Sequence, residues 1–207
     1  MFTQQTLRTF VALPLSEDMH AQLAQVQTRL RRSCPAGSVR WVKPERIHLT
    51  IFFLGDVLPA LLEPAREALG VVARHVSPFT FRVEGLGVFP NPRRPRVIWV
   101  GITDSNGRLA LLHQAVNEAL SQAGFRPEER AFNPHLTLGR VKRRAVLEEA
   151  RAVGSAVLRA EVGGLGEASG TEMILFRSVL KSTGAEYTPL ATFRLGGEAH
   201  HLDDLGT

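Results

Sequence analysis

The sequence predicts an α+β protein of two similar lobes, each a mainly antiparallel sheet with helices on its outer face, and a cleft between them. Short β-type runs alternate with segments of helical periodicity along the chain. A four-residue pattern, His-Leu-Thr followed by Ile or Leu, occurs twice, at residues 48–51 and 135–138. Each copy lies in an apolar run of strand length, at 47–55 and 132–139. The chain therefore divides into two comparable halves.

The first half opens with a strand at residues 6–13, which Pro14 ends. Ser16 then supplies an N-cap, and acidic residues follow in the first helical turn. Residues 34–37 break this helix. Its apolar stripe consists of residues at steps of 4, 3 and 4, namely Met19, Leu23, Val26 and Leu30.

The remaining elements follow from the same two periodicities. Further strands are expected at residues 40–42, 47–55, 79–88, 97–102, 132–139, 159–165, 172–180 and 187–195. Further helices are expected at about 61–74, 109–120 and 142–158. This order gives each half its own helices and its own copy of the His-x-Thr strand.

Length and composition indicate one ordinary globular unit of 207 residues. We expect residues 1–195 to form a single bilobal domain and the polar residues 196–207 to form a flexible tail. No run is long and apolar enough for a membrane span, and the first residues do not resemble a signal peptide, so a cytoplasmic protein is expected. Cys34, the only cysteine, excludes an intrachain disulfide.

The charge balance is modestly basic, with 25 basic against 20 acidic residues and a pI near 10.3. A positive excess favours anionic partners such as RNA, although plain solubility explains it equally well.

The polar residues of the two motifs are expected to line the cleft, because side chains alternate faces along a strand. His48 shares one face with Thr50, and His135 shares one with Thr137. The apolar residues of the first copy would face the core, namely Leu49, Ile51 and Phe53. Two imidazoles across a cleft suit phosphoester cleavage, because one can accept and the other donate a proton near neutral pH. The threonine hydroxyls can donate to phosphoryl oxygens.

A metal site is the other interpretation of these histidines. Zinc usually needs at least three protein ligands, and neither motif has a Cys, Asp or Glu nearby on the same face. We therefore expect neither a metal nor a cofactor.

Both motifs, with their flanks, resemble those of the 2H phosphoesterase superfamily. The matching flanks are Trp41-Val42 and Phe53-Leu54-Gly55 around the first copy, and Asn133-Pro134 and Gly139-Arg140 around the second. Residues 7–12, 97–101 and 178–190 also resemble the bacterial and archaeal RNA 2′,3′-cyclic phosphodiesterases, historically called 2′-5′ RNA ligases. The resemblance runs from about residue 6 to 195. It implies a bilobal fold, no metal, and opening of a 2′,3′-cyclic phosphate to a 2′-phosphate.

By this resemblance His48 is the proton donor to the 3′ oxygen and His135 the proton acceptor that activates water. The residues alone do not decide between these roles. Thr50 and Thr137 are expected to bind the phosphate. Arg140 follows Thr137 by three residues, so it points away from the site if the strand is regular and reaches a phosphate if the strand ends at Gly139.

The expected partners are RNA with 2′,3′-cyclic phosphate ends or cyclic nucleotides, and a monomer is expected. A 2′-5′ RNA ligase or a 2′-5′-oligonucleotide phosphodiesterase at the same site is the enzymatic alternative. An RNA-end-binding module without turnover is the alternative from another class. The helical histidines His20, His75 and His113 are expected at the surface, and the aromatic residues Phe10, Trp41 and Phe52 are expected in the core or against a base.

Overall fold

The structure is a computed structural model that describes residues 6–181 and 184–196. Within this part of the chain one antiparallel sheet has the order β7-β4-β5-β6-β3-β1-β8-β9, and β2 pairs with β6 beside this path. The strands are β1 (Leu7–Leu13), β2 (Val39–Trp41), β3 (Leu49–Val57), β4 (Phe79–Phe89), β5 (Val97–Thr103), β6 (His135–Val141), β7 (Gly166–Gly170), β8 (Glu172–Lys181) and β9 (Gly184–Arg194).

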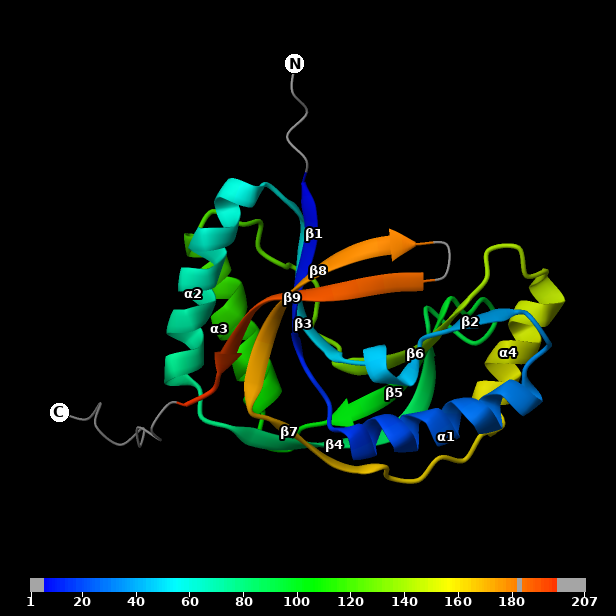
Figure 1. Ribbon diagram of the computed structural model, residues 1–207. Helices are drawn as coiled ribbons and strands as arrows, with labels where there is room; N and C mark the ends of the chain where they lie inside the picture. Colours follow the sequence, from blue (N-terminus) through cyan, green and yellow to red (C-terminus); the bar gives the residue numbers. More distant parts are fainter. Residues whose placement is uncertain (1–5, 182–183, 197–207) are drawn as a thin grey trace, which may run out of the picture.

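Four α-helices and two short 3-10 helices accompany the sheet in the described residues. They are α1 (Glu17–Ser33), α2 (Leu62–His75), α3 (Arg108–Gln122), α4 (Leu147–Arg159), η1 (Pro44–Arg46) and η2 (Pro59–Leu61). The predicted α+β class is confirmed. The two lobes are halves of one curled sheet, and the motif strands β3 and β6 are neighbours in its middle (Figure 1).

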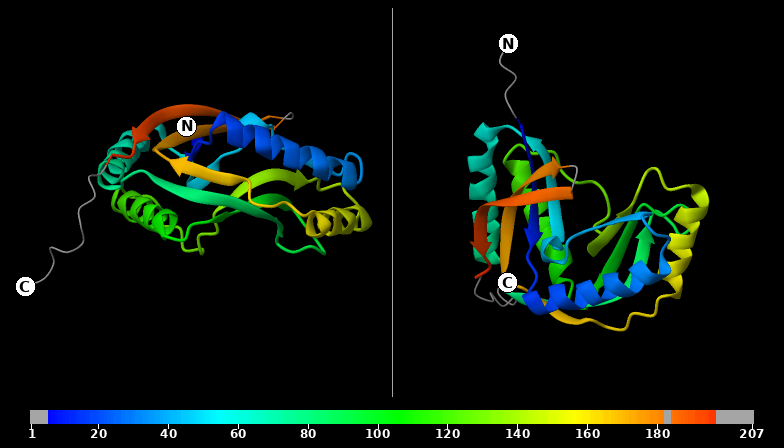
Figure 2. Two further views of the ribbon diagram at one scale, coloured as in Figure 1. Left: turned by 90° about the horizontal axis from the view of Figure 1, so that it is seen from below. Right: turned by 45° about the vertical axis from the view of Figure 1, so that its right-hand side comes forward.

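The helices cover the two halves in pairs (Figures 1 and 2). Helices α2 and α3 contact each other and the half that contains β3, β8 and β9. Helices α1 and α4 contact each other on the other half, where α4 also contacts β4. Helix α1 therefore follows β1 in the chain but lies across the opposite half of the sheet. None of the described helices is both long and apolar enough to span a membrane.

Helix α1 forms as its sequence predicts. The Ser16 hydroxyl accepts a hydrogen bond from the Met19 amide at 3.2 Å, which caps the first turn. The predicted apolar stripe is buried in the core, with Met19, Leu23, Val26 and Leu30 each at most 3% exposed.

Two predicted elements differ from the structure. The strand expected at 159–165 is wrong, because α4 continues to Arg159 and β7 begins only at Gly166, after a connection that contains two glycines. The last predicted helix begins later than expected, at Leu147, because the amide of Ala145 bonds back to the Lys142 carbonyl in a turn. The predicted flexible tail, apart from residue 196, lies outside the described residues.

Candidate active site

The register of the two motif strands brings their polar residues together. Strands β3 and β6 pair at Leu49 and Leu136, the residue after each motif histidine. In an antiparallel register centred on this pair, His48 lies opposite Thr137, and Thr50 lies opposite His135. The four side chains share the face opposite the buried leucines, so they line one surface in the middle of the sheet.

Each motif histidine makes an equivalent hydrogen bond to the backbone carbonyl two residues before it. Nδ1 of His48 donates to the Arg46 carbonyl at 2.9 Å, and Nδ1 of His135 donates to the Asn133 carbonyl at 2.8 Å. Because a carbonyl only accepts, Nδ1 carries the proton in each ring. The neutral tautomer therefore leaves Nε2 of each histidine as a free base.

Burial lowers the pKa of both histidines. Desolvation lowers the pKa of His48 from 6.5 to about 4; the bond to the Arg46 carbonyl opposes this shift, and the charges of His135 and His20 add to it. Desolvation also lowers the pKa of His135, where the Asn133 carbonyl opposes the shift and the Arg140 charge adds to it. Both rings are therefore mainly neutral at pH 7 in the free protein.

A β-bulge turns Phe53 onto the histidine face. In the pairing with β1, Thr50 lies opposite Ala12 but Phe53 lies opposite Phe10, so β3 has an extra residue between them. Phe53 is 56% exposed and its ring lies 5.8 Å from that of Phe10. The expectation that Phe53 faces the core is therefore wrong, because the bulge reverses the alternation after Ile51.

A bulge at the corresponding place in β6 does the same for Arg140. Thr137 lies opposite Trp99, but Gly139 lies opposite Ile98, so Leu138 is the extra residue. Arg140 then pairs with Val97, which shares its face with Trp99 on β5. The strand runs on to Val141 and is irregular, which neither of the two predicted alternatives for Arg140 foresaw. Arg140 thus lies on the face of His135.

Aromatic rings surround each histidine. His48 stacks on Phe10 with centroids 4.9 Å apart, and the ring of Tyr187 meets it edge-on at 5.1 Å. Phe89 meets His135 edge-on at 5.1 Å, and Trp99 lies 6.5 Å away. Of the aromatic residues with open roles, Phe10 and Phe52 are buried, while Trp41 lies under the guanidinium of Arg31 at 5.2 Å.

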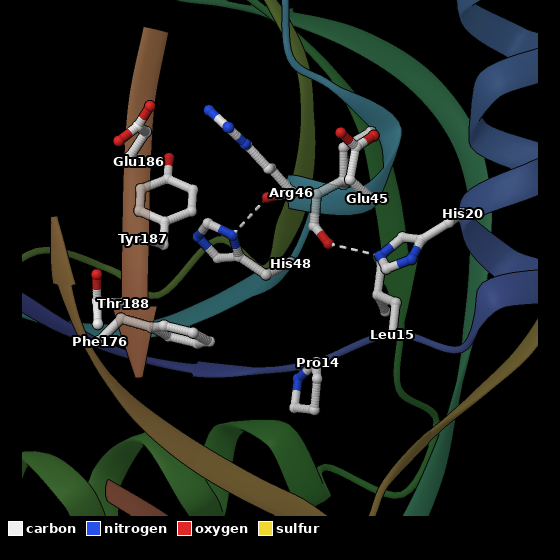
Figure 3. Close-up of a pocket in the computed structure, with 11 residues that line it drawn as sticks. Pro14, Leu15, His20, Glu45, Arg46, His48, Phe176, Glu186, Tyr187 and Thr188 are labelled. Atoms are coloured by element: carbon white, nitrogen blue, oxygen red, sulfur yellow. Dashed lines mark hydrogen bonds between the residues drawn. The ribbon is translucent and has the colours of Figure 1, made fainter. Parts of the chain in front are cut away.

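A cavity of about 390 Å³ lies beside His48 (Figure 3). Its walls come from α1, η1, β8 and β9, and include His20, Arg46, Phe176, Tyr187 and Thr188. Nε2 of His20 donates to the Ile47 carbonyl at 3.0 Å. His20, expected at the surface, is partly exposed and also lines this cavity, where its bond to the Ile47 carbonyl places it beside the start of β3. No periodicity in the sequence singled out His20 or Tyr187.

The ring of His113 also packs against an aromatic residue close to the second motif. Its ring stacks on Phe132 at 4.3 Å, three residues before His135, and it is partly buried. His75 is exposed, as predicted. Residues 6–181 and 184–196 contain no group of three or more His, Cys, Asp or Glu side chains placed to hold a metal ion.

The position of Arg140 allows a direct test. Arg140→Gln should raise KM for a cyclic phosphate substrate about tenfold, because an exposed guanidinium beside the site attracts the anion. The same variant should raise the pKa of His135, since the Arg140 charge lowers it. Steady-state kinetics and an NMR titration measure the two effects, with Arg94→Gln, at an exposed position between β4 and β5, as control. An unchanged KM would show that Arg140 does not contact the phosphate.

Comparison with known proteins identifies one family. The profile described as "LigT like Phosphoesterase" matches residues 13–99 and 100–166. A Methanothermobacter thermautotrophicus protein named "RNA 2′,3′-cyclic phosphodiesterase" is 33% identical over 189 residues, which is 91% of this chain and 99% of that protein. A Thermus thermophilus protein of the same name is 36% identical over 198 residues, covering 93% of this chain and 92% of that protein.

Solved structures have the same fold. The crystal structure of the Thermus thermophilus protein TT0787 superposes with a TM-score of 0.75 at 30% identity, over 93% of this chain and all of that one. The crystal structure of E. coli LigT complexed with 3′-AMP gives a TM-score of 0.72 at 23% identity, over 92% of this chain and 98% of that one.

Proposed function

This chain belongs to the LigT-like phosphoesterases of the 2H superfamily, and we propose that it hydrolyses the 2′,3′-cyclic phosphate at RNA ends to a 2′-phosphate without a metal ion. The names of its relatives support the substrate class. Their match over nine-tenths of this chain and of those relatives supports the same activity for the whole protein.

The observation that carries the proposal is the pairing of the two motifs in the middle of the sheet. A single Leu49–Leu136 pair sets each histidine opposite the threonine of the other motif. An in-line displacement at phosphorus needs a base on one side and an acid on the other. Two free Nε2 atoms from separate strands, with a hydroxyl next to each, suit that geometry.

In the proposed step, Nε2 of His135 takes a proton from water, and the water oxygen bonds to phosphorus. The bond from phosphorus to the 3′ oxygen breaks, and the imidazolium of His48 gives its proton to that oxygen. The hydroxyls of Thr50 and Thr137 donate to the phosphoryl oxygens as charge builds on them, and the Arg140 guanidinium offsets the negative charge. The product is a 2′-phosphate with a free 3′ hydroxyl.

The lowered pKa values of both histidines predict the pH dependence. The step needs one neutral and one protonated ring, and kcat/KM reports the ionisation of the free enzyme. Because the pKa of His48 is about 4 and that of His135 lies below 6.5, kcat/KM should pass through a maximum between pH 4 and 6.5. A bound phosphate anion favours both imidazolium forms, so the kcat maximum should lie at higher pH. Initial rates from pH 3.5 to 9 test this, and a kcat/KM maximum above pH 7 would contradict it.

The proposed function is tested with an RNA oligomer that ends in a 2′,3′-cyclic phosphate, incubated with the protein in excess EDTA. Phosphorus NMR distinguishes the 2′-phosphate from the 3′-phosphate. We expect the 2′-phosphate, at a rate unchanged by the chelator. A 3′-phosphate product, binding without turnover, or a rate that requires added zinc or magnesium would overturn the proposal.

A further inference from the structure

Two polar side chains of α1 reach the backbone of the two motifs. His20 is the first: its Nε2 donates to the carbonyl of Ile47, the residue directly before His48. The next carbonyl back, that of Arg46, anchors the ring of His48 itself. The bond from His20 therefore fixes the peptide group between Ile47 and His48, next to the carbonyl that orients the His48 ring.

Gln27 is the second. Its amide Nε2 donates to the Leu138 carbonyl at 2.8 Å and to the Val42 carbonyl at 2.7 Å, and the side chain is buried at 2% exposure. Leu138 is the extra residue of the bulge that turns Arg140 onto the histidine face. The Val42 amide also donates to the Leu138 carbonyl, at 2.9 Å, so the Gln27 amide adds a second bond at the point where the bulge interrupts the regular ladder.

The two residues are seven positions apart on α1, which is about two turns or roughly 10 Å along one helix face. We propose that α1 is a brace between the two motifs, with His20 as a positioning residue for His48 and Gln27 as a positioning residue for the Arg140 bulge. This inference rests on the proposed function.

This role explains why two polar residues, His20 and Gln27, lie beside the apolar face of α1. Gln27 is next to the buried Val26, and His20 is next to the buried Met19. The buried Gln27 amide has both of its bonds to backbone carbonyls, those of Val42 and Leu138, so its polar group is satisfied inside the core. Because α1 is one continuous helix from Glu17 to Ser33, it fixes the distance between the two backbone segments that His20 and Gln27 bond.

The His20 contact is tested by His20→Leu, which removes the donor, and His20→Gln, whose amide keeps a donor near the Nε2 position. His20→Leu should lower kcat about tenfold with KM within twofold of the wild type, and His20→Gln should recover kcat to within about threefold. His75→Leu, at an exposed helix position, is the matched control and should change neither constant.

The pH profile gives a second readout. The titratable or charged groups that face His48 are His20 on α1, Glu45 and Arg46 on η1, Glu186 and Tyr187 on β9, and His135 on β6. The charge of His20 lowers the pKa of His48, and His20→Gln removes that contribution. The optimum of kcat/KM should therefore move to higher pH in this variant, although kcat is retained.

The Gln27 contact is tested by Gln27→Met, which keeps the length of the side chain and removes both donors. KM for the cyclic substrate and the inhibition constant of inorganic phosphate should each rise about tenfold, because Arg140 is no longer held toward the site. Gln25→Met on the exposed face of α1 is the matched control. Val26→Ala, which shortens a core side chain and touches neither carbonyl, shows what loss of stability alone does to the kinetics.

The outcomes separate the two proposals. An inactive wild-type protein would refute the function, whereas an active wild type with unaffected His20→Leu and Gln27→Met variants would refute only the brace. A His20→Gln variant as slow as His20→Leu would also refute it for the first motif. If Gln27→Met does not fold, the His20 series and its pH profile still decide the role of α1.

Discussion

Replacing His48 with asparagine should lower kcat/KM for a 2′,3′-cyclic nucleotide by about 10²–10⁴-fold, and His135→Asn should do the same, because in the proposed mechanism each removes one half of a general acid–base pair. Asparagine is chosen because its amide nitrogen lies close to the position of Nδ1 in histidine. It can keep the hydrogen bond to the Arg46 or Asn133 carbonyl and removes only Nε2. The loss is thereby assigned to the proton-transfer atom.

The measurement is single-turnover kinetics with urea unfolding of each variant at pH 7. His75→Asn in α2 serves as the matched control, since its ring is exposed and bonds only within its own helix. The two variants should retain nucleotide binding, because the threonines and Arg140 are untouched. Turnover near the wild-type level in either variant would remove that histidine from the mechanism.

The double variant carries further information. If the two rings act in one concerted step, removing the second should cost little beyond the first, because the step already fails without its partner. Independent contributions would instead multiply. Near-multiplicative losses would therefore argue that the two proton transfers occur in separate steps.

The sequence was sufficient to predict the α+β class, the two motif strands and the core face of α1. These features repeat locally: alternation in a strand and steps of three and four in a helix depend on residues near in the chain. The wrong strand at 159–165 arose where such a signal is weakest, in a short stretch next to two glycines.

The two bulges could not be predicted from the sequence. A bulge is defined by the pairing with a neighbouring strand, which is β1 for the bulge in β3 and β5 for the bulge in β6. Regular alternation therefore misplaced Phe53 and left Arg140 undecided. His20 and Gln27 were missed for the same reason, because the carbonyls that they bond lie 27 and 111 residues away in the sequence.

The threonines give the second large effect. Thr50→Val and Thr137→Val should each lower kcat/KM about 30- to 1,000-fold, because a positioned hydroxyl donor is worth roughly 2–4 kcal/mol at a transition state. Valine keeps the shape and the strand preference of threonine and removes only the hydroxyl. The melting temperature should barely change, since both side chains are partly exposed on the histidine face.

The pairing register of β3 and β6 predicts which histidine each valine substitution affects. Thr137 lies opposite His48 and Thr50 lies opposite His135, so each valine removes a donor next to the histidine of the other motif. The double variant should lose affinity for inorganic phosphate as well as rate, which isothermal titration can measure. Thr192→Val, in β9 at the far end of the sheet order from the motifs, is a matched control for a strand threonine. If both motif variants kept full activity, the threonines would serve only the strands, and Arg140 would have to hold the phosphate alone.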